Sequence, residues 1–272
     1  MPIAIFAPLL HLWLYCYGAA MKRKVLIVGI GAGNPEHMTA QAIDALNRAD
    51  VLFIPHKGAE KQDLARLRQE ICERFLRSDS RLVDFDVPVR EQSTAYRESV
   101  ASWHDAVADI YERLLSSELG DGELGAFLIW GDPSLYDSTM RVFERIRAMG
   151  KIALEYEVIP GISAVQALAA AHKIPLNRIG ESILVTTGRR LAEDFPAAAD
   201  SVIVMLDGDC AFKKVDGDAE IYWGAYLGTS DEILISGRLR DVSDEIERVR
   251  EEARARKGWI MDTYLLRKPV KS

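Results

Sequence analysis

Cysteine and histidine are scarce in this chain, and none of them has the spacing of a metal or redox site. The 272 residues include three cysteines, at positions 16, 72 and 210, and five histidines, at positions 11, 37, 56, 104 and 172. Neither a C-x-x-C nor an H-E-x-x-H motif occurs. We therefore expect no zinc knuckle, no thiol redox motif and no bound metal. Widely separated free thiols are typical of a reduced, cytoplasmic protein.

Long runs of lysine or arginine are also missing. The formal net charge is −7, so a general electrostatic grip on nucleic acid is not expected. Basic residues adjoin only locally, as in Arg189-Arg190 and Lys213-Lys214. Either pair alone is typical of an ordinary solvated surface.

The first twenty residues contain no lysine, arginine, aspartate or glutamate. Their length would just span a bilayer, but they lack the positive segment that opens a signal peptide. A normal folded domain then begins with Met21-Lys22-Arg23-Lys24. We expect residues 1–20 to be an upstream extension outside the native fold, with a membrane anchor as the alternative.

From residue 24 onward, short apolar runs alternate with stretches of helical period. The expected strands are 25–28, 51–54, 82–87, 126–130, 152–158, 183–185, 202–206, 221–227, 233–235 and 258–267, and the expected helices are 38–49, 62–76, 96–115, 140–149, about 163–173, and one capped by Ser243 that runs to about 256. This alternation predicts an α/β fold with mainly parallel sheets. We expect two α/β domains, 21–145 and 146–272, with more strands in the second.

The stretch "KVLIVGIGAGNPEHMT" looks at first like a dinucleotide-binding fingerprint. Gly29 and Gly31 fit the G-x-G-x-x-G pattern, but Asn34 stands where the third glycine should be. The acid that would bind the ribose is also misplaced, because Asp50 precedes the next apolar run instead of following it. A nicotinamide cofactor is therefore rejected. The glycines still allow the backbone to approach some other ligand closely.

Two later turns resemble the first in their setting. Trp130-Gly131-Asp132-Pro133 and Pro160-Gly161-Ile162-Ser163 each follow an apolar strand, as does the loop 29–35. All three are expected to meet at the carboxyl end of a sheet, where open α/β folds place ligands. This ordered set resembles the tetrapyrrole methylase family, over about residues 24–268. The resemblance implies two α/β domains with S-adenosylmethionine bound between them.

Stretches outside the three loops resemble one branch of that family. They are "IPHKGAEKQDLARLRQEIC", "WGDPSLYDST", "TTGRR", residues 202–208, "WGAYLG" and "GWIMDTYLLR". The branch implies C-methylation of a tetrapyrrole in cobalamin synthesis, coupled to loss of an acetyl group as acetate. One departure from the common family pattern is Asn34, which replaces the usual acid of the first loop and is a poor candidate for acid–base work.

The family resemblance also implies a set of cofactor-binding positions. These are Ala32, Trp130, Gly131, Asp132, Leu135, Ser163, Ala164, Met205 and Gly228. Each has an ordinary structural alternative: Met205 as core, for example, or Asp132 as a helix cap. Their joint order along the chain favours the cofactor site. Methyl transfer from a sulfonium needs mainly orientation at attack distance, which fits the lack of a visible catalytic triad.

Loss of acetate requires a base that activates water. Asp137, His37 and Tyr136 lie beside the cofactor loops and are the candidates, although Asp137 is also placed to cap the following helix. The substrate carries several carboxylates, which arginine forks match. The candidate arginines are Arg189, Arg190, Arg141 and Arg90.

The sequence leaves rival functions open, among them a member of the same family that methylates a different carbon of the macrocycle. A family member can act on RNA or on a protein side chain, although the missing basic face argues against RNA. A non-catalytic module that binds a corrinoid is the other alternative. We expect a homodimer only because members of the family commonly pair.

Overall fold

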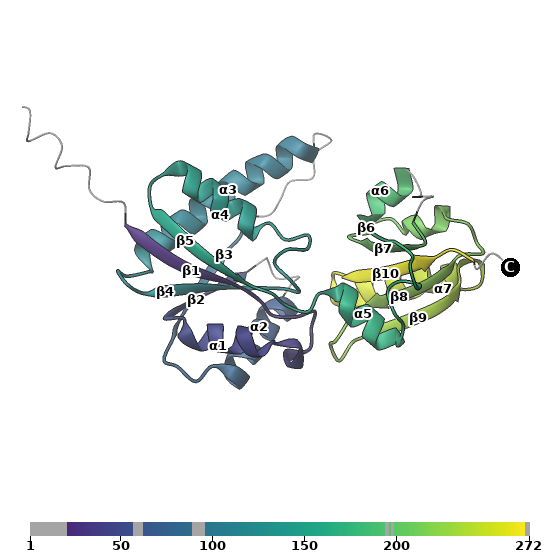
Figure 1. The fold of residues 1–272 in the computed structure, drawn as a ribbon, viewed down its shortest axis with the longest axis horizontal. Coiled ribbons are helices and arrows are strands. Elements are labelled where there is room, and N and C mark those ends of the chain that lie inside the picture. The colour runs from purple at the N-terminus through teal and green to yellow at the C-terminus, as the bar shows by residue number, and fades with distance from the viewer. Residues whose placement is uncertain (1–20, 57–61, 89–95, 194–195, 197–198, 270–272) are drawn as a thin grey trace, which may run out of the picture.

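Two five-stranded sheets, one after the other along the chain, form the framework of the computed structural model (Figure 1). The structure describes residues 21–56, 62–88, 96–193, 196 and 199–269. The first sheet contains β1 (Lys22–Gly29), β2 (Val51–His56), β3 (Arg81–Asp86), β4 (Leu124–Ile129) and β5 (Ala153–Ile159). Its order is β3-β2-β4-β1-β5 and every pairing is parallel. The carboxyl ends of all its strands therefore share one edge.

Helices cover both faces of the first sheet. One face carries α1 (Ala40–Arg48) and α2 (Gln62–Phe75), and the other carries α3 (Tyr96–Ser117) and α4 (Thr139–Met149) (Figure 1). Alternate strand residues explain the two cores: Leu26 packs on the α1 side, whereas Ile27 packs on the α3 side. The expected mainly parallel α/β arrangement is confirmed here.

The second sheet is mixed and has the order β6-β7-β10-β8-β9. It comprises β6 (Ile183–Thr187), β7 (Ser201–Met205), β8 (Glu220–Ala225), β9 (Ile233–Arg238) and β10 (Asp262–Arg267), of which only β6 and β7 pair in parallel. Helix α5 (Ala164–His172) packs on one face, while α6 (Gly188–Glu193), the short helix η3 (Ala211–Lys214) and α7 (Leu239–Lys257) pack on the other.

Two boundaries differ from the sequence-based expectations. Strand β5 pairs with β1 from Lys22↔Ala153 to Val28↔Ile159, so the first sheet ends at Ile159. The predicted domain boundary at 145/146 therefore lies too early, because it assigns β5 to the second domain. Helix α7 begins at Leu239, and Ser243 lies inside it instead of capping it. The expectations for residues 1–20 and for Cys16 fall outside the described residues.

Membrane-spanning helices and metal-binding clusters are both absent from the described ranges. No helix in them is long and apolar enough to cross a membrane. They also contain no cluster of three or more His, Cys, Asp or Glu side chains placed to hold a metal ion.

A buried polar network fixes the turn that follows β7. Asp262 on β10 accepts hydrogen bonds from Trp223 Nε1 and from Arg250 Nε, both at 3.0 Å. Arg250 also donates through Nη2 to the carbonyl oxygen of Asp207 at 2.5 Å. The Asp207 carboxylate accepts from the Tyr264 hydroxyl at 2.6 Å. Buried charges of this kind are tolerated only when each has its partner.

We expect Arg250→Met to lower the free energy of unfolding by about 3–5 kcal/mol, because it leaves the Asp262 carboxylate buried without its cation. The double variant Arg250→Met/Asp262→Asn should recover part of that loss, since the neutral amide oxygen still accepts from Trp223. Urea unfolding followed by circular dichroism measures both values. A double variant no more stable than Arg250→Met would contradict this account.

Candidate active site

The turns after β1, β4 and β5 touch one another through glycine backbones. Gly31 and Gly131 form an antiparallel bridge, with Gly131 N donating to Gly31 O at 2.8 Å and Gly31 N to Gly131 O at 3.3 Å. A methyl group on Gly29 would lie 2.6 Å from Gly161 N, so the β1 and β5 turns also meet without room for a side chain. The three loops expected to converge at the carboxyl edge do so.

Asp132 joins two of these turns. Its Oδ1 accepts from Ser134 N and its Oδ2 from Gly161 N, each at 2.8 Å. Burial raises the pKa of this carboxyl, but the hydrogen bonds from Ser134 and Gly161 outweigh burial and hold it below the ordinary value. The ionised carboxylate of Asp132 therefore ties the β4 turn to the β5 turn, which is a structural role next to the glycine contact.

Four of the predicted cofactor residues pack on one hydrophobic cluster. The cluster combines side chains of α5 and the second sheet with Ala32 of the first loop, and its buried members are Ala32, Val165, Ala167, Leu168, Ile203, Leu227 and Leu265. Leu135, Ala164 and Met205 pack against it while partly buried. Residues from both sheets thus reach the same place, although more than 170 positions separate Ala32 from Met205.

The two halves also meet where Gly228 approaches the first loop. A methyl group on Gly228 would lie 2.9 Å from Asn34 N, and one on Gly33 would lie 2.7 Å from Thr229 Cγ2. The Asn34 side chain caps the short helix η1 (Pro35–His37) by accepting from Glu36 N at 2.9 Å. Asn34 therefore has a local structural role, as the exchange of acid for amide suggested.

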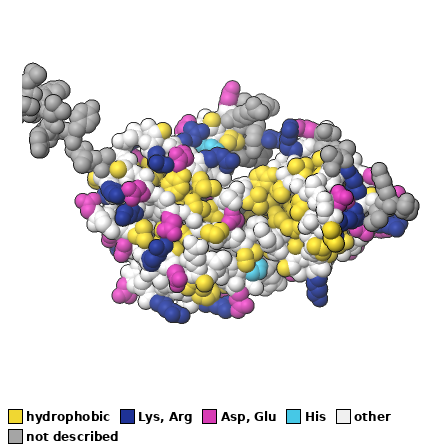
Figure 2. All heavy atoms as spheres, viewed as in Figure 1, with side chains coloured by type: hydrophobic (Ala, Val, Ile, Leu, Met, Phe, Trp, Pro, Cys, Tyr) yellow, Lys and Arg dark blue, Asp and Glu magenta, His cyan; other side chains and the backbone are white. Residues whose placement is uncertain are grey.

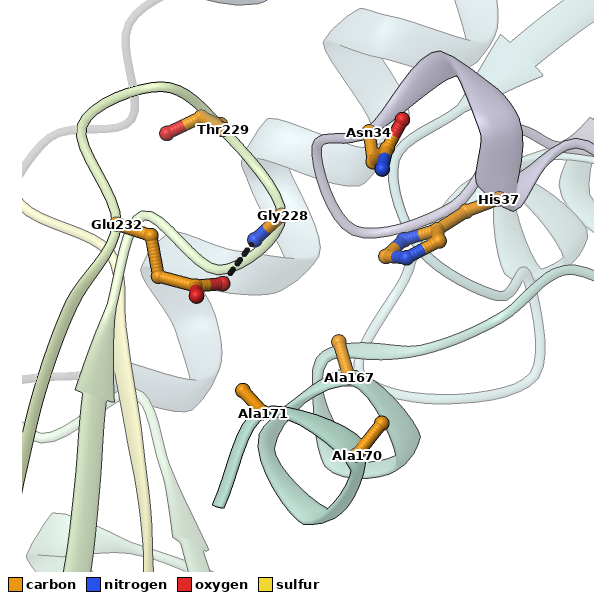
Figure 3. Close-up of a pocket in the computed structure, with 8 residues that line it drawn as sticks. All are labelled: Asn34, His37, Ala167, Ala170, Ala171, Gly228, Thr229 and Glu232. Carbon is orange, nitrogen blue, oxygen red and sulfur yellow. Dashed lines mark hydrogen bonds between the residues drawn. The ribbon is translucent and has the colours of Figure 1, made fainter. Parts of the chain in front are cut away.

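His37 faces a pocket on this side of the contact. The pocket has a volume of about 300 Å³ and lies between η1, α5 and the turn of Gly228 (Figure 3). Glu232 spans the turn by accepting from Gly228 N at 2.7 Å. Burial lowers the pKa of His37, and the charge of Glu232 opposes that shift. Among the described residues, His37 Nδ1 is buried and has no hydrogen-bond partner.

Three further predicted cofactor residues surround the glycine contact. Ser163 is the N-cap of α5 and forms a capping box with Gln166. Trp130 Nε1 is buried without a partner in the described part of the chain, which leaves a donor available. A methyl group on Gly131 would approach no described atom more closely than Ser163 Cα, at 3.8 Å. An open space beside a glycine backbone and an unused donor fit a ligand at this point.

Asp137 and Tyr136 lie on the loop between β4 and α4. The N-cap position of α4 is Ser138, and the Asp137 carboxylate just before it accepts from Thr139 N, the first helical N–H, at 2.6 Å. Its charge also acts on the buried Arg68, whose pKa burial lowers to about 10 against the opposing effects of Tyr111 and Asp137. Burial raises the pKa of Tyr136, so its phenol stays protonated near neutral pH and has no free base to offer.

The candidate arginines differ in their surroundings. Arg141 on α4 donates to the Asp137 carbonyl oxygen at 3.0 Å, and Arg190 on α6 pairs with Glu193 at 2.8 Å. Arg189 is exposed beside Arg190, while Arg90 lies outside the described residues. Helix α4 packs on the first sheet and α6 on the second, and both lie on the same side of the molecule (Figure 1).

Leu206 was not predicted, although it follows Met205 directly. Its side chain is 64% exposed and its φ is +54°, a left-handed conformation that non-glycine residues rarely adopt. The following Asp207-Gly208 pair signals a turn, but no glycine or asparagine at position 206 marks that residue as left-handed. The left-handed conformation of Leu206 is seen only in the backbone geometry of the structure.

The titration of Asp132 gives a test of the link between the turns. Its folded pKa lies below the unfolded value of about 3.9, so its stabilisation is complete above that value and is lost as the pH falls through the folded pKa. Asp132→Asn removes the titrating group. The difference in unfolding free energy between the unchanged chain and this variant should be constant above about pH 5 and shrink below about pH 4. Urea unfolding between pH 3 and pH 7 measures it, and a difference that grows with acidification would contradict the assignment.

Comparison with known proteins places this geometry in a family. Residues 24–243 match the tetrapyrrole (corrin/porphyrin) methylases. A precorrin-6A synthase (deacetylating) from Sinorhizobium sp. is 60% identical over 252 residues, which covers 92% of this chain and 97% of that protein. The crystal structure of a putative cobalamin synthesis related protein (CobF) from Corynebacterium diphtheriae superposes with a TM-score of 0.79 at 37% identity, covering 90% of this chain and 98% of that one.

A more distant structure shares the fold. The uroporphyrin-III C-methyl transferase from Thermus thermophilus, solved with S-adenosyl homocysteine, has a TM-score of 0.57 at 16% identity and covers 90% of this chain and 97% of that one. With the family match extending over most of the sequence, the chain belongs to the tetrapyrrole methylases.

Proposed function

We propose that this chain is an S-adenosylmethionine-dependent C-methyltransferase that converts precorrin-5 into precorrin-6A. In that reaction C1 of the macrocycle is methylated and the acetyl group leaves as acetate. The observation that carries the proposal is the 60% identity to a precorrin-6A synthase (deacetylating) along nearly its whole length. The convergence of three glycine turns on a cluster shared by both sheets supports it.

The residues around the glycine contact fit the cofactor. Gly131 leaves open space beside the backbone, Trp130 offers a free donor, and Ala32, Ala164 and Met205 supply an apolar wall. When bound, S-adenosylmethionine supplies an electrophilic methyl group. The protein's part is to hold the loops rigid, which Asp132 does by tying the β4 and β5 turns together.

Asp137 is the residue best placed for the acetate-forming half of the reaction. Its Oδ2 makes no hydrogen bond to a described residue, so this oxygen is available to take a proton from water. The hydroxide then adds to the acetyl carbonyl, and cleavage of the carbon–carbon bond releases acetate. The electron pair stays on C1, the carbon that becomes methylated.

The arginines on α4 and α6 are proposed to bind the substrate carboxylates. Arg141 lies on α4, beside the first sheet, and Arg189 lies on α6, beside the second. One guanidinium group from each helix would hold a macrocycle by the carboxylates on its rim. Local cations then reconcile a chain of net charge −7 with an acidic substrate. We further propose that the protein is cytoplasmic and forms a homodimer, as expected of a biosynthetic enzyme of this family.

Gly131→Ala tests the cofactor position. The added methyl group would enter the open space beside Ser163, so the affinity for S-adenosylmethionine should fall at least roughly tenfold. Gly150→Ala is the matched control, because Gly150 has a similar φ (+69° against +71°) and also open surroundings, but lies at the end of α4. Calorimetric titration measures both affinities. Unchanged binding by Gly131→Ala, or tight binding of NAD, would contradict the site.

The coupled reaction has its own test. Precorrin-5 and methyl-labelled S-adenosylmethionine should give labelled macrocycle and acetate in equal amounts. Asp137→Asn keeps the oxygen that accepts from Thr139 N but cannot take a proton, so acetate release should fall by about 10²–10⁴-fold with cofactor affinity preserved. Methylation without acetate would indicate a methylase acting at another carbon, and binding without turnover would indicate a non-catalytic corrinoid-binding module.

A further inference from the structure

Five non-glycine residues in the described part of the chain adopt positive φ, and three of them are accounted for by their own contacts. Lys173 caps α5 with its backbone N–H. Cys210 is a buried N-cap of η3. Tyr226 is buried, and its hydroxyl donates to Trp259 O at 2.6 Å. The remaining two, Tyr136 and Leu206, are exposed and apolar.

Leu206 is held in its strained conformation from both sides. Met205 before it is paired with Thr187 on β6 and with Thr263 on β10. Asp207 after it belongs to the buried network with Arg250 and Tyr264. The backbone therefore has no freedom to relax, and the leucine side chain stays 64% exposed at a left-handed position with φ +54°.

Tyr136 is held in the same way on the other unit. Leu135 before it packs on the hydrophobic cluster and donates its N–H to Asp132 O at 3.2 Å. Asp137 after it is fixed by Thr139 N and by Arg141. Tyr136 itself has φ +53° and is 43% exposed. Each of these two residues thus combines a strained backbone with an exposed hydrophobic side chain.

The chain neighbours of these two residues, Leu135 and Met205, pack against the same hydrophobic cluster, which combines Ala32 of the first loop with side chains of α5 and the second sheet. Figure 2 shows hydrophobic side chains gathered on both units, on either side of the place where they meet. We propose that Tyr136 and Leu206 form a clamp that grips the ring of the tetrapyrrole substrate. This inference rests on the proposed function, and it adds residues that determine affinity for the macrocycle.

The surroundings favour a macrocycle as the occupant. A tetrapyrrole presents a broad apolar ring with carboxylates at its rim, and the candidate arginines stand on α4 and α6, the helices that follow Tyr136 and β6 along the chain. Covering both exposed side chains would remove apolar surface from water, which favours binding. The backbone strain raises the free energy of the unliganded protein, and the same strained conformation keeps both side chains exposed.

The test uses the full chain and uroporphyrin III, a stable tetrapyrrole with carboxylates around its rim, with binding followed by quenching of tryptophan fluorescence. Leu206→Gly and Tyr136→Gly should each weaken uroporphyrin binding by roughly tenfold, while affinity for S-adenosylmethionine stays unchanged. Because glycine relieves the positive φ, the melting temperature of both variants should stay level or rise. Leu206→Met and Tyr136→Phe, which keep an apolar side chain, should retain binding.

Lys173→Gly is the matched control, since it relieves the same backbone strain at φ +57° but lies at the end of α5. It should leave uroporphyrin binding unchanged. Absence of binding by the unsubstituted chain, equal affinity in the glycine variants, or a lowered melting temperature that marks a packing role would overturn the clamp. Conversion of precorrin-5 is measured separately on the unsubstituted chain, so failure of the proposed function is distinguishable from failure of the clamp.

Discussion

The structure depends on the contact of three backbones at Gly29, Gly131 and Gly161. No side chain fits on Gly29 or Gly161, since a methyl group on Gly29 would lie 2.6 Å from Gly161 N and one on Gly161 would clash with Gly131 O, whereas the space beside Gly131 is open. The contact brings the ends of β1, β4 and β5 together and thereby sets where Trp130, Asp132 and Ser163 stand. Parallel pairing in the first sheet aligns the strand ends, but the glycines determine how closely the turns approach.

The second sheet contributes to the site through a different kind of constraint. Its turn after β7 is held by charges buried with their partners, Arg250 with Asp262 and with the carbonyl oxygen of Asp207. Such a network stabilises one arrangement more than it stabilises the fold as a whole. It fixes Met205 on the shared cluster and keeps Leu206 in a conformation that a free chain would leave.

Much of this could be predicted from the sequence, because it rests on local patterns. Alternating apolar runs predicted the strands, and glycine turns after three of them predicted the convergence at one edge. The domain boundary was wrong because the alternation in β5 shows only that the strand is half exposed, not which sheet it joins. The prediction that Ser243 caps the last helix was wrong, because the residue that precedes α7 is Arg238, which gives no capping signal in the sequence. Leu206 could not be found, since its strain comes from contacts with distant residues.

The short passage between the two sheets has a consequence for ligand binding. Strand β5 ends at Ile159 and α5 begins at Ala164, so residues 160–163 join the sheets, and these same residues include Gly161 and Ser163. A rotation of one sheet against the other would turn about residues that we propose to line the cofactor position. A movement of the two sheets relative to each other would therefore also change the contacts of residues 160–163 with the cofactor. If cofactor binding changes the angle between the two sheets, and macrocycle binding depends on that angle, each ligand changes the affinity of the protein for the other. Thermodynamic linkage makes the two changes equal.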